Sequence, residues 1–170
     1  MIMKRIFIVI SLLMLLLSGC GKDQKTYDIA ADFLSLEEVS GLLGYTPVME
    51  EENTRLQKKV TYKNETKGDG DIIRLSIYPP NTKYSADDIK AQFDAEKKKN
   101  EEYKSLIEFE EADAEAFISI PSAHIYKNGH YAVVTAGSGG EEEQINLLKT
   151  ISQIVIGHLN ELEPVTEEVE

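Results

Sequence analysis

The dipeptide Asn128-Gly129 constrains the fold of this chain more than any other feature of the sequence. It separates two segments, 122–127 and 130–136, that are rich in β-branched, aromatic and small apolar residues. Both central positions of a type I′ hairpin turn need positive φ angles, which Asn and Gly adopt at low cost. The sequence therefore predicts an antiparallel β-hairpin in the C-terminal half of the chain.

Other segments of the chain also carry strand patterns. Apolar and polar residues alternate in 56–63 and again in 73–77, which is typical of half-buried strands. The polar linker 64–70 is short enough to join them in a second antiparallel hairpin. Weaker patterns predict short strands at 106–109 and 117–120.

Three segments carry helix patterns. Ser35 and Ser85 each begin a capping box, with an acidic residue three positions later. The helix after Ser85 contains the apolar pair Ile89 and Phe93 but then becomes rich in lysine, so we expect only its first half to pack firmly. The third segment, 141–161, has apolar residues at three- and four-residue steps, which predicts a long amphipathic helix.

In chain order these patterns predict an α+β fold, an antiparallel sheet of about five strands packed with three helices in the order α-β-β-α-β-β-β-α. The helices cover one or both faces of the sheet. Residues 28–162 suit a single domain with a single core. Residues 163–170 are rich in glutamate and poor in apolar side chains, so we expect a disordered acidic tail.

The beginning of the chain has the composition of an export signal. Lys4 and Arg5 precede an apolar stretch, 6–17, whose length of about 12 residues is well below the roughly 20 that a transmembrane helix needs. The stretch ends in Leu17-Ser18-Gly19-Cys20, which resembles the lipobox of bacterial lipoproteins. This resemblance implies removal of a signal peptide, residues 1–19, by cleavage between Gly19 and Cys20. It also implies a diacylglyceryl group on the Cys20 sulfur and acylation of the new amino terminus.

The lipobox resemblance predicts where the folded part lies. Residues 20–27 would form a lipidated tether that reaches at most ~25 Å, which keeps the domain near the extracytoplasmic face of the cell membrane. An outer membrane is the alternative if the cell has two membranes, because Gly21 rather than Asp follows Cys20. Cys20 is the only cysteine, so once its sulfur carries the lipid the folded part contains no thiol, which excludes disulfides and thiol catalysis. The order of elements also resembles, loosely, small extracytoplasmic lipoproteins with a PsbP- or Mog1-like fold, and this likeness implies no site residues.

The charge of the chain limits its partners. Loss of residues 1–19 removes two basic residues and no acidic one, so the net charge changes from −12 to −14. A strongly acidic body is repelled by nucleic acid and by anionic lipid headgroups. We therefore expect no nucleic-acid partner, and a membrane contact made through the lipid on Cys20. An envelope protein or a small ligand is the expected binding partner.

Two groups of residues invite a metal hypothesis. In the predicted hairpin His124 lies opposite Val133 and His130 lies opposite Lys127, so the two imidazoles point to opposite faces and do not share an ion. The second group consists of oxygen-bearing side chains in the linker between the two earlier strands, and it forms a candidate calcium site whose spacing differs from that of an EF-hand. Its members are Asn64, Glu65, Asp69 and Asp71.

The chain has no recognisable catalytic motif, and nothing in it calls for a cofactor. We therefore expect a lipid-anchored binding module that recognises its partner without chemistry. Two alternatives remain open, an envelope hydrolase with an unrecognised carboxylate site and a purely structural or assembly lipoprotein. Converging carboxylates of perturbed pKa would favour the hydrolase, and an exposed apolar patch without a pocket would favour the structural role.

Overall fold

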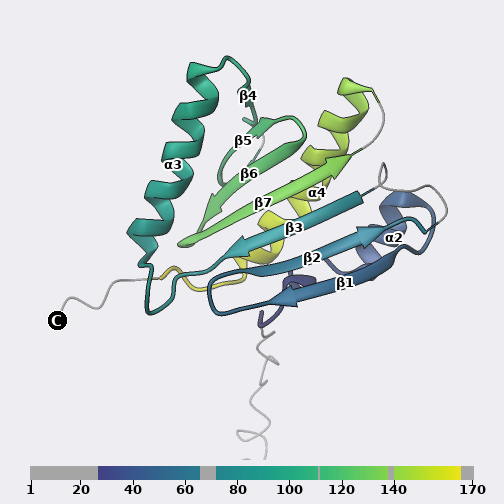
Figure 1. Cartoon of the computed structure of the whole chain (residues 1–170), viewed down its shortest axis with the longest axis horizontal. Helices are drawn as coiled ribbons and strands as arrows, with labels where there is room; N and C mark the ends of the chain where they lie inside the picture. Colours follow the sequence, from purple (N-terminus) through teal and green to yellow (C-terminus); the bar gives the residue numbers. More distant parts are fainter. Residues whose placement is uncertain (1–26, 66–71, 111, 138–139, 166–170) are drawn as a thin grey trace, which may run out of the picture.

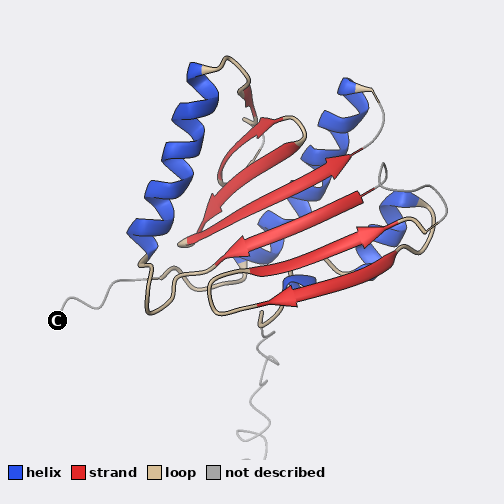
Figure 2. Cartoon of the chain, viewed as in Figure 1, coloured by secondary structure: helices blue, strands red, loops and turns tan. Residues whose placement is uncertain are grey.

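The computed structural model describes residues 27–65, 72–110, 112–137 and 140–165. The predicted leader, most of the tether and the last five residues of the predicted tail lie outside the described residues. Figures 1 and 2 show one twisted antiparallel sheet with helices beside it. In chain order the elements are η1 (Ala30–Asp32), α2 (Leu36–Leu43), β1 (Val48–Asn53), β2 (Lys58–Lys63), β3 (Ile72–Tyr78), α3 (Ala86–Glu102), β4 (Ile107–Glu108), β5 (Glu115–Ser119), β6 (Ser122–Lys127), β7 (His130–Gly137) and α4 (Glu141–Asn160).

The sheet has seven strands in the order β1-β2-β3-β7-β6-β5-β4. The mixed α+β class with three α-helices is confirmed. The expected number of about five strands was too low. Three strands rather than two follow α2, and four rather than three follow α3. Strand β1 was missed because all six of its residues are exposed and three of them are consecutive glutamates, which leaves no apolar alternation. Strand β4 has only two residues, within the weak pattern at 106–109.

Both predicted hairpins are confirmed. Strands β6 and β7 pair across a turn in which Asn128 has a φ of 50° and Gly129 a φ of 81°. Strands β2 and β3 pair antiparallel on either side of the polar linker. The register of the first hairpin places His124 opposite Val133, as the sequence predicts.

The helix caps follow the sequence closely. The Ser35 hydroxyl accepts a hydrogen bond from the Glu38 N–H at 3.3 Å, and the Glu38 carboxylate accepts one from the Ser35 N–H at 2.7 Å. Ser85 and Asp88 make the same reciprocal pair before α3. Gly44 ends α2 with a φ of 72°. None of the helices in the described part of the chain combines the length and apolarity that a membrane crossing requires.

The main hydrophobic core lies between one face of the sheet and the helices α2 and α4. Leu75 and Ile77 of β3 are fully buried there, as are Leu148 and Val155 of α4. Tyr62 is also fully buried, and its hydroxyl donates to the Leu34 carbonyl oxygen, so the largest polar group of this core is satisfied. Because successive side chains of a strand point to opposite faces, the residues between these core positions lie on the other face of the sheet.

Helix α3 packs on that other face of the sheet. Its buried Ile89 and Phe93 contact Phe117 of β5 and Tyr131 of β7, whose neighbours along each strand belong to the main core. The second half of α3 is also held in place, contrary to the expectation from its lysines. Asn100 is 8% exposed, and its side-chain oxygen accepts hydrogen bonds from two serine hydroxyls, one of them on β5. A polar anchor of this kind leaves no apolar signal in the sequence.

Candidate functional site

Helix α3 covers only part of its face of the sheet. It packs over β6 and β7, whereas β1 and β2 lie away from it toward the opposite edge (Figure 1). No other helix of the described chain packs on this side, because α2 and α4 belong to the main core. We term the side chains that β1, β2 and most of β3 present here the open face. Its polar members are Glu50, Glu52, Lys59, Thr61, Lys63, Arg74 and Ser76, and the register places the apolar Val48 and Ile72 on the same face at the Lys63 end.

The strand register aligns polar side chains across the open face. Thr61 of β2, Arg74 of β3 and Thr135 of β7 stand directly opposite one another. Glu50 extends this row on β1, and Ser122 extends it on β6. Residues opposite one another in antiparallel strands have Cβ atoms about 4.5–5.5 Å apart, so the five side chains form a continuous polar row.

The β1 side of the open face is held by two ion pairs. Lys63 Nζ lies 2.5 Å from a Glu50 carboxylate oxygen, and Lys59 Nζ lies 2.9 Å from one of Glu52. Such exposed pairs contribute only about 0–1 kcal/mol each, but they fix where the long side chains lie. A hollow of about 190 Å³ lies among the three glutamates of β1, Lys59 and Thr61. Both lysines of the open face therefore already have acidic partners.

Arg74 differs from these two lysines. Its Nε atom is buried and has no hydrogen-bond partner, and no acidic side chain of the described chain forms an ion pair with it. A guanidinium is always charged and offers five N–H donors. In a chain with a net charge of −12, an arginine that pairs with no acidic side chain among the described residues is a notable departure.

The half of this face under α3 is closed and aromatic. The His124 imidazole stacks on Phe117 with ring centroids 4.5 Å apart, and its Nδ1 atom lies 2.6 Å from the Tyr131 hydroxyl oxygen. Burial lowers the pKa of His124 to about 4, with a smaller opposing effect of Glu96. The imidazole is thus neutral at pH 7 and packed among aromatic rings.

The other two histidines lie elsewhere. His130 faces the side opposite to His124, as expected, because it stands opposite Lys127 in the register. His158 of α4 bonds Glu38 at 2.9 Å and lies 3.4 Å from the Tyr27 hydroxyl. Among the described residues no three metal-binding side chains come together.

The contacts of Glu38 bring a serine, a histidine and a carboxylate together without forming a catalytic triad. Glu38 accepts hydrogen bonds from the Ser35 hydroxyl at 2.7 Å, and its other oxygen contacts His158. Burial alone would raise the pKa of Glu38, but bonds from Ser35 and His158 outweigh it and lower the pKa. A triad needs the imidazole between hydroxyl and carboxylate, whereas here the carboxylate lies in the middle. The arrangement caps α2 and does not activate Ser35.

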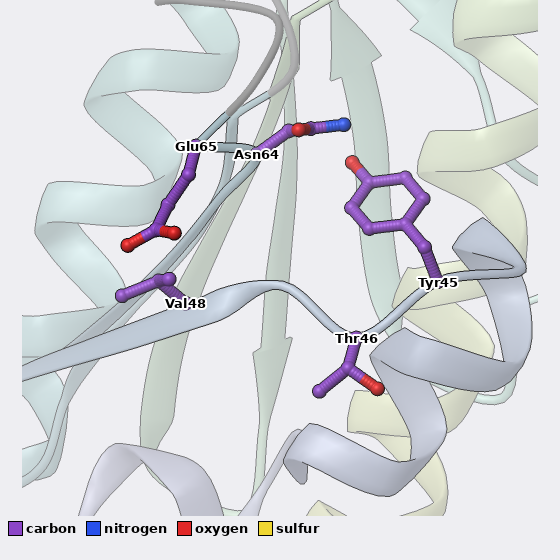
Figure 3. Close-up of a pocket in the computed structure, with 5 residues that line it drawn as sticks. All are labelled: Tyr45, Thr46, Val48, Asn64 and Glu65. Carbon is purple, nitrogen blue, oxygen red and sulfur yellow. The ribbon is translucent and has the colours of Figure 1, made fainter.

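Two of the calcium candidates line a second hollow. Figure 3 shows Asn64 and Glu65 around it, with the Tyr45 hydroxyl directed toward Asn64. The hollow measures about 380 Å³, and Thr46 and Val48 complete its lining. The Tyr45 hydroxyl is buried without a hydrogen-bond partner in the described chain. Asp69 and Asp71 lie outside the described residues, so the calcium hypothesis stays a prediction.

Calorimetry tests the calcium hypothesis directly. Calcium takes six to eight oxygen ligands, so binding at these four residues should give saturable heat at millimolar calcium and raise the melting temperature. The Glu65→Gln variant should weaken both responses, because it removes one of three carboxylates. Absence of heat and of any change in melting temperature in the unaltered chain eliminates the site.

No protein family, curated protein or solved structure matches this chain. The likeness to PsbP- and Mog1-like lipoproteins therefore stays a prediction. The open face was also not anticipated from the sequence, since strand patterns do not show which half of a sheet a helix will leave uncovered. The only available signal was Arg74, a charged residue between the apolar Ile73 and Leu75.

Proposed function

We propose that this chain is a lipid-anchored extracytoplasmic binding lipoprotein without catalytic activity, and that the open face is its recognition surface. The lipobox supports the anchor, and Cys20 precedes the first described residue, Tyr27, by only seven positions. The observation that carries the recognition surface is the uncovered, polar half of the sheet. This part of the sheet carries charged side chains and a hollow and is not covered by a helix. Such a surface is able to bind a protein or a small ligand.

The Cys20→Ala variant tests the anchor. Without the sulfur atom no diacylglyceryl group attaches, so we expect a full-length or unlipidated chain that leaves the membrane fraction in carbonate or high salt. Two acyl chains bind a bilayer far more firmly than one, so the loss should be nearly complete. Ser18→Ala, which keeps a small residue before the cysteine, is the matched control. Unchanged acylation and fractionation of Cys20→Ala would contradict the anchor.

Site-specific photocrosslinking in intact cells tests the recognition surface. A photoreactive residue in place of Lys63, on the open face, should capture a defined partner. The same residue in place of Gln153, an exposed position on α4, should not capture it. Equal capture from both positions, or none from position 63, would rule out the open face as the recognition surface.

A further inference from the structure

The central feature of the open face is Arg74, whose Nε atom has no hydrogen-bond partner among the described residues. A buried donor left without an acceptor destabilises the folded chain, and more so when the group is charged. The Nε atom of Arg74 is such a donor, while the rest of the side chain is half-buried and reaches solvent. Folded chains keep an unsatisfied group of this kind where an outside partner or water completes it.

The groups beside Arg74 are also unused donors. Thr61, its neighbour on β2, is 5% exposed, and its hydroxyl makes no hydrogen bond to another described residue. Ser76, two positions along β3, is 8% exposed and is equally without a partner in the described chain. On the β7 side, Thr135 is already bonded to Ser122 at 3.0 Å. The register therefore places two hydroxyls without partners among the described residues next to Arg74, one on β2 and one on β3.

We propose that Arg74, with Thr61 and Ser76, binds a carboxylate group of the ligand. This inference rests on the open face being the recognition surface and names the chemistry recognised there. A carboxylate matches the planar guanidinium through two parallel hydrogen bonds. The charge balance also favours a single negative charge. Lys59 and Lys63 are paired with Glu52 and Glu50, so among the described residues of the open face Arg74 alone carries a positive charge without an acidic partner.

The same balance disfavours a phosphate group. A phosphate monoester carries close to two negative charges at pH 7, and here it would meet one free cation beside two glutamates. Like charges at the β1 side raise its energy, whereas a monovalent carboxylate is neutralised by Arg74 alone. The proposed ligand is therefore a carboxylic acid, either a small organic acid or an acidic side chain or chain terminus of a peptide.

The test uses the full chain purified in detergent and follows the arginine Nε–H signals by NMR. The sequence contains only Arg5, Arg55 and Arg74, and Arg5 belongs to the proposed leader, so the signals of Arg55 and Arg74 are assigned by substitution. Succinate should shift the Arg74 signal saturably, and its uncharged analogue succinamide should not. Phosphate at equal ionic strength should bind at least tenfold more weakly. A blocked peptide with one glutamate, run in parallel, distinguishes a peptide source from a small acid.

Variants make the outcome decisive. Arg74→Gln should abolish succinate binding. Arg74→Lys keeps the positive charge but loses the planar pair of N–H donors, so it should weaken succinate binding several-fold. The lysine variant also covers the case in which Arg74→Gln fails to fold. Arg55→Gln, in the exposed β1–β2 turn, is the matched control and should bind normally. Equal responses to succinate and chloride, tighter binding of phosphate, or full binding by Arg74→Gln would overturn the proposal. Partner capture at position 63 would survive that result, so the two proposals fail separately.

Discussion

Replacing Phe93 with Ala should lower the free energy of unfolding by about 3–5 kcal/mol. Phe93 is fully buried, and its ring lies 5.5 Å from that of Phe117, 5.8 Å from Tyr131 and 5.9 Å from Tyr126. Its removal leaves a cavity between α3 and the sheet and also loses these ring contacts, which are worth about 0.5–1.5 kcal/mol each beyond area burial. Denaturant unfolding followed by circular dichroism at pH 7 measures the change.

Tyr103→Ala is the matched control for Phe93→Ala. Tyr103 is an aromatic residue at the C-terminal end of the same helix, but its side chain is 74% exposed. Substitution there should change the free energy of unfolding by no more than about 0.5 kcal/mol. Similar losses in the two variants would mean that α3 is not packed on the sheet through Phe93, and that the aromatic half of this face is not closed.

Local rules were sufficient for much of this fold. The turn at Asn128-Gly129 and the two capping boxes each depend on a few neighbouring residues, and all three are confirmed. The helix at 141–161 was recognised from its own periodicity to within one residue of its observed end. Patterns of this kind are visible in the sequence because the residues that interact are close together along the chain.

The features that sequence analysis missed depend on distant contacts. Strand β1 forms because its backbone pairs with that of β2. Its exposed glutamates carry no strand pattern of their own. Asn100 anchors α3 through Ser119, which is 19 positions away. Nor does the sequence show that Arg74 pairs with no acidic side chain in the described part of the chain, because that depends on which side chains the register places beside it.

The position of Tyr27 relates the proposed anchor to the proposed recognition surface. The Tyr27 carbonyl oxygen accepts a hydrogen bond from Lys58 at 2.7 Å, and its ring packs on Phe33. Lys58 begins β2 beside the β1–β2 turn, whereas Asn64 follows the opposite end of that strand. The described chain therefore begins beside the β1–β2 turn, at the end of β2 opposite to Asn64.

Acidification should destabilise the fold through His124. The pKa of its imidazole is about 4 in the folded chain because of burial, against about 6.5 in an unfolded chain. The unfolded state therefore binds a proton first, so the stability that neutral His124 contributes is complete above pH 6.5 and is lost as the pH falls toward 4. The difference of roughly 2.5 pKa units corresponds to about 3 kcal/mol. Glu96 of α3 raises this pKa and Lys99 lowers it, and the overall shift caused by burial stays downward.

The His124→Gln variant isolates this contribution from the other groups that titrate on acidification. A glutamine keeps a hydrogen-bonding group near the Tyr131 hydroxyl but does not titrate. Burial also lowers the pKa of His130, and the hydrogen bonds from Ser35 and His158 lower the pKa of Glu38, but both groups remain in the variant and cancel in the comparison. The wild-type chain should be the more stable at pH 7, and its advantage should shrink by about 3 kcal/mol between pH 7 and pH 4. A constant difference across this range would show that His124 is not held neutral by α3, and with it that this half of the sheet is more open than the aromatic packing indicates.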